Sequence, residues 1–244
     1  MADKRKHRGP HPDDQKLFGS EEILTLRKAV CDLSQLLSKG YAMKSSLKLV
    51  GDHFALTQRQ RLAVRRSVCS DQQLSLRTQK QLTIEQITAQ RIVIDGYNLL
   101  ITLEALLSGA PVFIGVDGCL RDMSGIHGSY RRVTETSEAL ELLADYLASL
   151  KVVSVRWLFD RPVSNSGRLK AFIRELAEEN GWVWEIELQF NPDKELSSTD
   201  LIIVTSDSDV LDNCGRWVNL TAGLIRYAEV SGRKFSNVIG LSGV

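Results

Sequence analysis

The segment Ile92-Val93-Ile94-Asp95-Gly96-Tyr97-Asn98 gives the clearest indication of architecture in this chain. Its β-branched run followed by an Asp-Gly pair predicts a short strand that is buried on both faces. Two further apolar runs end in the same way, because residues 152–159 precede Asp160, and residues 201–205 precede Ser206-Asp207-Ser208-Asp209. In open α/β sheets, ligands bind beyond the carboxyl ends of such strands. We therefore expect these aspartates to converge at one edge of a parallel sheet.

The sequence around this segment alternates between strand and helix patterns. We expect strands at 91–95, 152–159, 182–188 and 200–205, a strand or hairpin at 111–121, and helices at about 98–108, 135–150, 167–180, 208–214 and 221–230. Strands separated by helices indicate a parallel sheet with right-handed crossovers. Residues 91–244 are therefore predicted to form a three-layer α/β/α domain of Rossmann-like type.

The amino-terminal part has a different pattern. Residues 1–19 are charged and almost devoid of apolar side chains, which predicts a disordered basic tail. Apolar residues then recur at helical spacing, so residues 20–75 are predicted to form a small all-α bundle, followed by a polar connector at 76–90. The last bundle helix, expected at 57–70, carries Arg59, Arg61, Arg65 and Arg66. Its basic stripe fits contact with nucleic-acid phosphates, a helix-turn-helix module, or a solvated helical surface.

Charge is divided unequally along the chain. Residues 1–91 hold 17 Lys and Arg against 9 Asp and Glu, whereas residues 92–244 hold 14 against 21, although the net charge is only +1. This division favours a first half that meets a polyanion and a second half that gathers acids around a site. With no run of about 18 apolar residues and no apolar leader, we expect a cytoplasmic protein without membrane contact. The four cysteines form no CxxC pair, which argues against a zinc ribbon or a dithiol site.

The strand-end aspartates suit a hard divalent cation. Mg²⁺ and Mn²⁺ prefer oxygen ligands and keep several waters, so a few carboxylates suffice to hold them. Asp95, Asp160, Asp207 and Asp209 are the predicted metal ligands, and a bound Mg²⁺ or Mn²⁺ would activate water for attack on a phosphodiester. The alternative is that aspartates such as Asp95 and Asp160 only cap the helices that follow them.

Three motifs resemble those of the NYN branch of PIN-like nucleases. They are Ile94-Asp95-Gly96-Tyr97-Asn98-Leu99, Leu158-Phe159-Asp160-Arg161-Pro162-Val163-Ser164 and Val204-Thr205-Ser206-Asp207-Ser208-Asp209, and they occur in the family's order over roughly residues 91–230. The whole chain also resembles an uncharacterised prokaryotic family, the domain of unknown function 434. The nuclease resemblance implies a Mg²⁺- or Mn²⁺-dependent endoribonuclease whose partner is RNA, with DNA as an alternative.

The same resemblance implies roles for individual residues. Asp95 would be the first metal ligand with Asn98 as its companion, Asp160, Asp207 and Asp209 would complete the catalytic acids, and Ser164, Asn165 and Ser206 would bind substrate or metal-bound water. PIN-like domains usually add an acid on a helix before the late strand, and no such helix is expected here. Asp200 begins that strand, more than about 15 Å from its acidic end, so it is a poor ligand. Glu135 and Glu138 both remain as the acid of the second helix.

A polar, glycine-rich stretch at residues 116–132 has no counterpart in those motifs. Its density of glycine and charge predicts a functional loop or hairpin, with an ordinary exposed hairpin as the alternative. Arg121 and Arg131 are expected to contact substrate phosphates, and His127 to act as a general acid or phosphate donor. Arg61 and Arg65 of the bundle are expected to bind RNA.

Two other functions compete with the ribonuclease. One is a catalytically inactive RNA-binding or regulatory protein with the same fold, and the other is a metal-dependent phosphatase. The chain has no GxxxxGK[ST] loop, and it lacks the paired DxD of aspartate-nucleophile phosphatases. The oligomeric state stays open, with a homodimer as one option.

Overall fold

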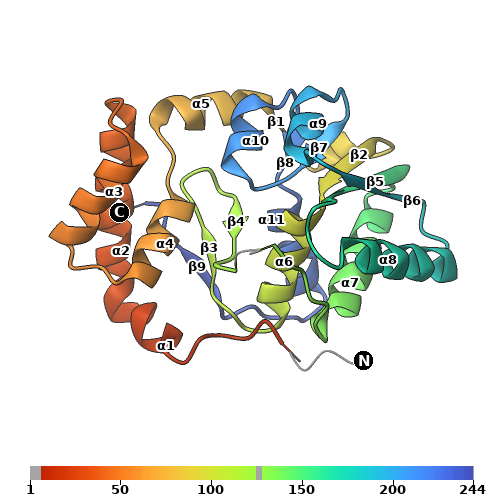
Figure 1. Ribbon diagram of the computed structural model, residues 1–244, viewed down its shortest axis with the longest axis horizontal. Coiled ribbons are helices and arrows are strands. Elements are labelled where there is room, and N and C mark those ends of the chain that lie inside the picture. The colour runs from red at the N-terminus through yellow and green to blue at the C-terminus, as the bar shows by residue number, and fades with distance from the viewer. Residues whose placement is uncertain (1–6, 125–127, 244) are drawn as a thin grey trace.

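The computed structural model describes residues 7–124 and 128–243 and contains a six-stranded, fully parallel sheet between two layers of helices. The strand order is β1-β8-β7-β2-β5-β6. Its strands are β1 (Gln81–Leu82), β2 (Arg91–Asp95), β5 (Ser154–Asp160), β6 (Trp184–Gln189), β7 (Ile202–Val204) and β8 (Trp217–Val218). The predicted three-layer α/β/α architecture, preceded by a helical region, is confirmed (Figure 1).

Successive residues of the central strand β2 face opposite layers. Ile92 and Ile94 are fully buried against one helical layer, and Val93 against the other. The first layer consists of α6 (Gly96–Leu107), α7 (Glu135–Ser149), α8 (Ser166–Asn180) and α11 (Leu220–Val230), and the second contains α9 (Pro192–Ser198) and α10 (Ser208–Asn213). Burial on both faces explains why this strand is a continuous apolar run without polar alternation.

The amino-terminal helices are α1 (Asp14–Leu17), α2 (Ser20–Ser38), α3 (Met43–His53), α4 (Gln58–Ser67) and α5 (Asp71–Lys80), and η1 (Glu85–Ile87) is a 3₁₀ turn. Helices α2, α3 and α4 match the predicted bundle. A second sheet, with order β4-β3-β9, consists of β3 (Val112–Ile114), β4 (Leu120–Arg121) and β9 (Val238–Gly240). Phe113 of this sheet and Leu241, which directly follows β9, are buried in the same hydrophobic cluster as bundle residues such as Leu26. The bundle and the α/β part therefore share a core through this small sheet (Figure 1).

The short strands β1, β8 and β9 were not expected, and three further segments also differ from expectation. Residues 7–19 are ordered against the body of the protein, because Phe18 packs on Phe113 with ring centroids 5.0 Å apart and Asp14 pairs with Arg59. Helix α5 runs from the last residues of the predicted bundle into the predicted connector, and a capping box from Ser70 stabilises its start. Residues 192–198 form α9, where no helix was expected. In each of these three segments a tertiary contact or a helix cap stabilises the structure, and the spacing of apolar residues did not predict it.

Among the residues that the structure describes, no helix is both long enough and apolar enough to cross a membrane.

Candidate functional site

The three predicted aspartate motifs lie at the carboxyl ends of adjacent strands. β2 pairs with β5 on one side and with β7 on the other, which places Asp95 next to Leu158 and Ile94 next to Val204. The chain runs from β2 outward to β5 and β6, and then crosses back to β7 on the other side of β2. Ligands of open α/β sheets bind at such a reversal of strand order. The acidic residues are thus brought together where the fold places ligands.

Asp95 is the most deeply buried carboxylate of this group, at 8% exposure. Burial is the main cause that raises the pKa of Asp95 to about 7, since the charged form loses hydration. A hydrogen bond from the Thr205 hydroxyl (2.7 Å) opposes the shift, whereas the charges of Asp207, Asp193 and Asp160 add to it. The Asp95 side chain makes no capping bond to α6. Helix capping therefore does not account for this residue.

Asp193, on the unexpected helix α9, belongs to the same acidic group. Burial raises the pKa of Asp193, and the charges of Asp207, Asp160 and Asp209 raise it further. Helix α9 is capped by Asn191, whose side chain accepts a hydrogen bond from the Lys194 amide, and Pro192 occupies its first turn. Both residues are helix-start signals that the sequence already contained. A helix that carries an acid therefore precedes the late strand, where none was expected, whereas Asp200 precedes β7 and, among the described residues, only its backbone carbonyl accepts a hydrogen bond, from Arg216.

Asp207 and Asp209 stand at the start of α10. Asp207 Oδ1 accepts hydrogen bonds from the amides of Asp209 (2.9 Å) and Val210 (3.1 Å), so this carboxylate does cap a helix. Its second oxygen makes no hydrogen bond to the described residues. Asp160, at the end of β5, is half-buried, and burial raises its pKa. Asp160 does not cap α8, whose N-cap residue is Asn165.

Asn98 fixes the loop that carries Asp207. Its Oδ1 accepts hydrogen bonds from both the amide (2.8 Å) and the hydroxyl (2.9 Å) of Ser206, while Nδ2 has no partner among the described residues. Ser206 is 6% exposed. Its side chain thus holds the loop in place, which differs from the substrate contact that we expected of it.

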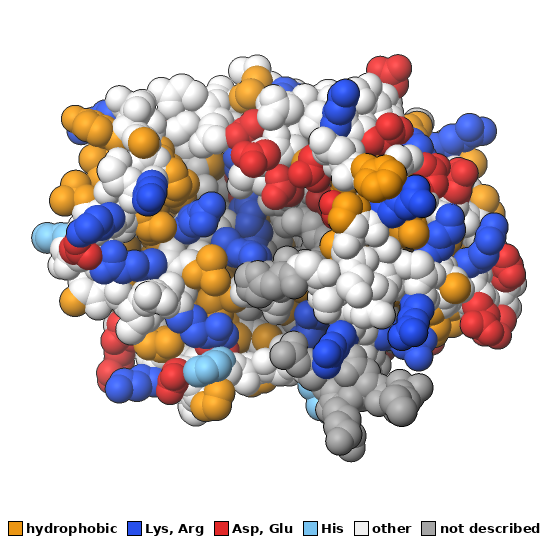
Figure 2. Space-filling view, viewed as in Figure 1, with side chains coloured by type: hydrophobic (Ala, Val, Ile, Leu, Met, Phe, Trp, Pro, Cys, Tyr) orange, Lys and Arg blue, Asp and Glu red, His pale blue; other side chains and the backbone are white. Residues whose placement is uncertain are grey.

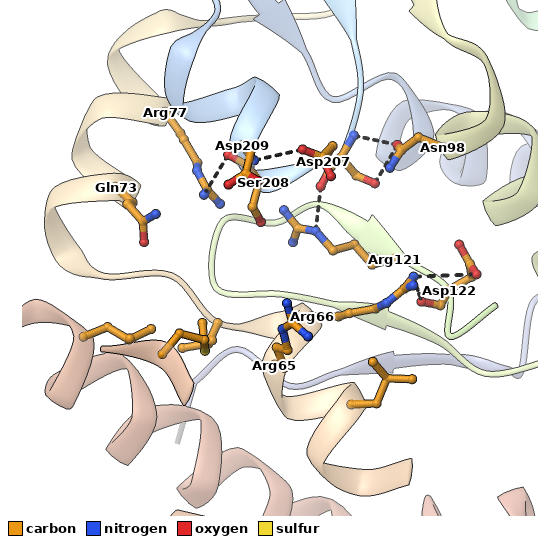
Figure 3. A pocket seen from close by; sticks show the side chains of 15 residues that line it. Arg65, Arg66, Gln73, Arg77, Asn98, Arg121, Asp122, Asp207, Ser208 and Asp209 are labelled. Atoms are coloured by element: carbon orange, nitrogen blue, oxygen red, sulfur yellow. Dashed lines mark hydrogen bonds and ion pairs between the residues drawn. The ribbon is translucent and has the colours of Figure 1, made fainter. Parts of the chain in front are cut away.

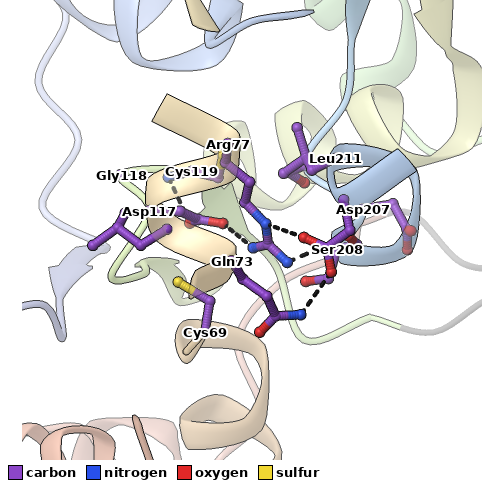
Figure 4. Close-up of polar contacts among 12 residues, drawn as sticks. Cys69, Gln73, Arg77, Asp117, Gly118, Cys119, Asp207, Ser208 and Leu211 are labelled. Atoms are coloured by element: carbon purple, nitrogen blue, oxygen red, sulfur yellow. Dashed lines mark hydrogen bonds and ion pairs between the residues drawn. The ribbon is translucent and has the colours of Figure 1, made fainter. Parts of the chain in front are cut away.

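Two arginines donate hydrogen bonds to the backbone carbonyls on either side of Asp207. Arg121 Nε donates to the carbonyl of Ser206 (2.7 Å). Arg77 donates to the carbonyl of Ser208 (3.3 Å) (Figure 4). Both arginines also bind Asp117, which is buried, and Arg77 binds Asp212 as well. Burial opposes ionisation of Asp117, but the two guanidinium groups hold its pKa at about 2. We refer to Arg77, Arg121 and Asp117 as the arginine brace.

The brace corrects the role predicted for Arg121. We expected Arg121 to contact substrate phosphates, but it is 7% exposed and its guanidinium donates hydrogen bonds to Asp117 and to the Ser206 carbonyl. A buried arginine is tolerated only when its charge is paired and its donors are satisfied. The sequence did not indicate this because Arg77 lies 40 residues before Asp117.

A cavity of about 600 Å³ separates the acidic edge from the helical bundle. One wall holds Asn98, Asp207 and Asp209, and the other holds Arg65, Arg66 and apolar bundle residues such as Leu62 (Figure 3). We refer to this cavity as the cleft. In the space-filling view, acidic side chains lie beside a group of Lys and Arg side chains on the same face (Figure 2). The arrangement offers an anionic polymer both a cationic wall and a carboxylate edge.

The bundle arginines differ in whether their guanidinium groups already bond to protein groups or can contact a ligand in the cleft. Arg65 is exposed and makes no ion pair or hydrogen bond with the described residues. Arg61 instead bonds Asp52 (2.8 Å) and the carbonyl of Leu56, and Arg66 bonds the carbonyl of Asp122. Of the two bundle arginines predicted to bind RNA, Arg65 faces the cleft, whereas Arg61 ties α4 to α3.

The other predicted substrate residues lie elsewhere. Ser164 and Asn165 bind the 128–130 segment: the Ser164 amide donates to Gly128, and Asn165 Nδ2 donates to the Tyr130 carbonyl. Arg131 lines a second cavity, beside Arg8 and Arg59. His127 lies outside the described residues. Glu135 and Glu138 pair with His7 and Arg233 respectively.

The donor set suits a hydrated cation better than an enclosed one. Across residues 7–124 and 128–243, no three His, Cys, Asp or Glu side chains are close enough together to hold a metal ion by themselves. Mg²⁺ commonly uses one or two carboxylates and keeps several waters, which fits aspartates that share a site without converging on one point. The residues that could hold such a cation are Asp95, whose pKa responds to the charges of Asp207, Asp193 and Asp160, and Asp207, one of whose oxygens makes no hydrogen bond to the described residues.

The fold and this edge define an α/β/α protein with a strand-end acidic site and an attached helical bundle. The family model described as domain of unknown function DUF5616 matches residues 84–223, and the chain belongs to this family. A second model, protein of unknown function DUF434, matches residues 25–80. The predicted resemblance to that family is therefore confirmed for the helical region and not for the whole chain.

One curated relative supports the same assignment. The uncharacterized protein MJ0935 of Methanocaldococcus jannaschii is 31% identical over 208 residues, which cover 84% of this chain and 99% of that protein. No solved structure matches this chain. The relative therefore shares the combination of helical and α/β parts.

Proposed function

We propose that this protein is a divalent-metal-dependent endoribonuclease that hydrolyses RNA phosphodiester bonds at the acidic edge of its parallel sheet. The observation that carries the proposal is the position of Asp193. With it, five aspartates from four separate segments gather beyond β5, β2 and β7, and after burial the charges of neighbouring aspartates raise the pKa of Asp95 and of Asp193. Carboxylates that oppose one another's ionisation in this way are suited to a cation.

Each group has a definite task in this proposal. Asp95 and Asp207 would bind Mg²⁺ or Mn²⁺, which supplies an activated water and stabilises the charge that develops on the phosphate. Asn98 Nδ2 and the three remaining aspartates would orient coordinated water and the scissile phosphate. Arg65, across the cleft, would bind a neighbouring phosphate. Arg65 favours a polymer over a small phosphate ester as substrate. Only a polymer has a second phosphate that can contact Arg65 while the scissile phosphate lies at the aspartates.

The test is cleavage of a mixed pool of labelled RNA by the full chain, with Mn²⁺, with Mg²⁺ and with EDTA. We expect internal cleavage with either metal and none with EDTA. Asp193→Asn should lower the rate by about 10- to 100-fold, as loss of a residue that supports a metal site typically does. The matched control is Asp200→Asn, an exposed aspartate at the opposite edge of the sheet, which should keep full activity. Equal activity of Asp193→Asn and the natural protein would contradict the proposal.

A second function, an inactive RNA-binding protein, is favoured by one observation: among the described residues no three metal-binding side chains enclose a point. Calorimetric titration with Mn²⁺ separates the two functions. Metal binding that disappears in Asp207→Asn supports the nuclease. RNA binding without any metal binding at this edge supports the inactive protein.

A further inference from the structure

Phe190 is an exposed aromatic ring beside the acidic site. It directly follows β6, it is 73% exposed, and it belongs to none of the hydrophobic clusters formed by the described residues. Phe113 and Phe159, in contrast, are at most 1% exposed. Packing of the core therefore does not explain the ring at position 190.

Arg161 holds this ring from one side. Its guanidinium carbon lies 4.8 Å from the centroid of Phe190, which is a cation–π contact. Arg161 makes no ion pair with the described carboxylates. The backbone holds the pair in register, because the Arg161 amide donates to the carbonyl of Gln189 (2.8 Å) and Asp160 stands opposite Gln189 in the sheet. The guanidinium thus orients the ring and keeps its charge available for an anion.

The pair lies at the rim of the acidic site. Arg161 directly follows Asp160, and Phe190 comes three residues before Asp193. Strand order places β6 on the far side of the site from β7, whereas the cleft with Arg65 borders the loop after β7. The carboxyl edge from β7 to β6 spans about 14 Å, at about 4.8 Å per strand. A polymer bound along this edge would meet Arg65 at one end, the aspartates in the middle and Phe190 at the other.

We propose that Phe190 and Arg161 form a stacking platform for an unpaired nucleobase next to the scissile phosphate. The open ring face would stack on the base, and the guanidinium would attract the adjoining phosphate. A base inside a duplex has its faces covered, so the platform selects single-stranded RNA. This inference rests on the proposed function. The other cation–π pair of this type, Arg132 on Phe172 (4.0 Å), offers no such platform because Phe172 packs against the main core.

The test measures RNA binding without catalysis. Phe190→Ala, Phe190→Trp and the control Val183→Ala, which alters an exposed residue (67%) near the opposite end of β6, are compared in EDTA. A labelled single-stranded RNA and the same RNA in a duplex are titrated by fluorescence anisotropy. We expect Phe190→Ala to weaken single-strand binding about tenfold, while Phe190→Trp and Val183→Ala bind as the natural protein does. The added tryptophan of Phe190→Trp should be quenched by the single strand and not by the duplex.

The outcomes separate this inference from the proposed function. If the natural protein cleaves RNA and Phe190→Ala binds and cleaves normally, the platform is overturned and the nuclease stands. If the natural protein never cleaves but Phe190→Ala loses single-strand binding, the platform stands and the nuclease fails. If Phe190→Ala changes the sedimentation of the protein and leaves RNA binding intact, the ring serves self-association and the platform is overturned.

Discussion

Asn98 Oδ1 accepts two hydrogen bonds from Ser206, one from its amide and one from its hydroxyl, and so joins the first turn of α6 to the loop after β7. This link fixes Asn98 between two catalytic candidates of the acidic site. Asp95 lies three residues before it, and Asp207 follows Ser206 directly.

We expect Asn98→Ala to lower the cleavage rate by roughly 10- to 100-fold, since Asp207 loses a support and the site loses a free amide donor. Asn98→Asp keeps the acceptor for Ser206 but adds a charge, so it should bind Mn²⁺ and still cleave slowly. Single-turnover rates and Mn²⁺ titrations check both variants. Normal cleavage by Asn98→Ala would remove Asn98 from the site.

Arg65 and Arg61 provide a matched pair four residues apart on α4. Arg65→Glu should weaken RNA binding and flatten its dependence on salt, because a phosphate contact and its released counterion are lost. Arg61→Glu should leave the salt slope unchanged, because Arg61 is occupied by Asp52 and Leu56. Binding measured at several salt concentrations tests this. Similar losses in both variants would place RNA elsewhere on the bundle.

The raised pKa of Asp95 predicts a dependence on pH. Only the carboxylate binds metal, so the affinity for Mn²⁺ should rise steeply as pH passes about 7. Without metal, the folded protein keeps a proton on Asp95 that the unfolded chain loses near its ordinary pKa of 3.8. The free energy of unfolding contributed by this group should therefore fall as pH rises from about 4 to about 7.

Asp95→Asn should remove this contribution, since its amide does not titrate. Urea denaturation in EDTA across that pH range, with Asp200→Asn as the control, measures the effect. An unchanged pH slope in Asp95→Asn would show that other groups cause it.

The arginine brace predicts a large effect on stability. Arg77→Met removes one of the two cations that pair with Asp117, so we expect a loss of about 3–5 kcal/mol in the free energy of unfolding. Asp212→Asn in the same chain should recover part of the loss, because the carboxylate that loses its arginine then carries no charge, while Asp117 keeps Arg121. Arg216→Met, at an exposed arginine, is the control and should stay within about 0.5 kcal/mol. A small effect of Arg77→Met would show that the network is well hydrated.

Much of the site followed from local sequence. Each strand that ends in an aspartate is a short apolar run, and parallel pairing brings such ends together wherever the strands fall in the sheet. Asp95, Asp160 and Asp207 could therefore be placed without knowledge of strand order. Helix α9 was missed because seven residues provide too little periodicity, although Asn191 and Pro192 marked its start.

The remaining differences depend on contacts between distant segments. The residues next to Arg121 in the sequence do not indicate whether its side chain is exposed or buried. It is buried because Asp117 and Arg77, the latter from a distant segment, meet it at the loop after β7. Residues 7–19 have no apolar residues at regular helical spacing, yet Phe18 packs on Phe113 of the second sheet. Local propensity carries no information about such pairs.

The arginine brace connects the two segments of the chain that different family models match. Arg77 falls within the segment matched by DUF434, whereas Asp117, Arg121 and Asp212 fall within the segment matched by DUF5616. A lineage that lost the helical segment would leave Asp117 buried with one cation in place of two, and would leave Asp212 without its arginine. Mutations in one segment are thus constrained by the side chains of the other. Although two family descriptions divide this chain, the brace joins the two matched segments into one structural unit.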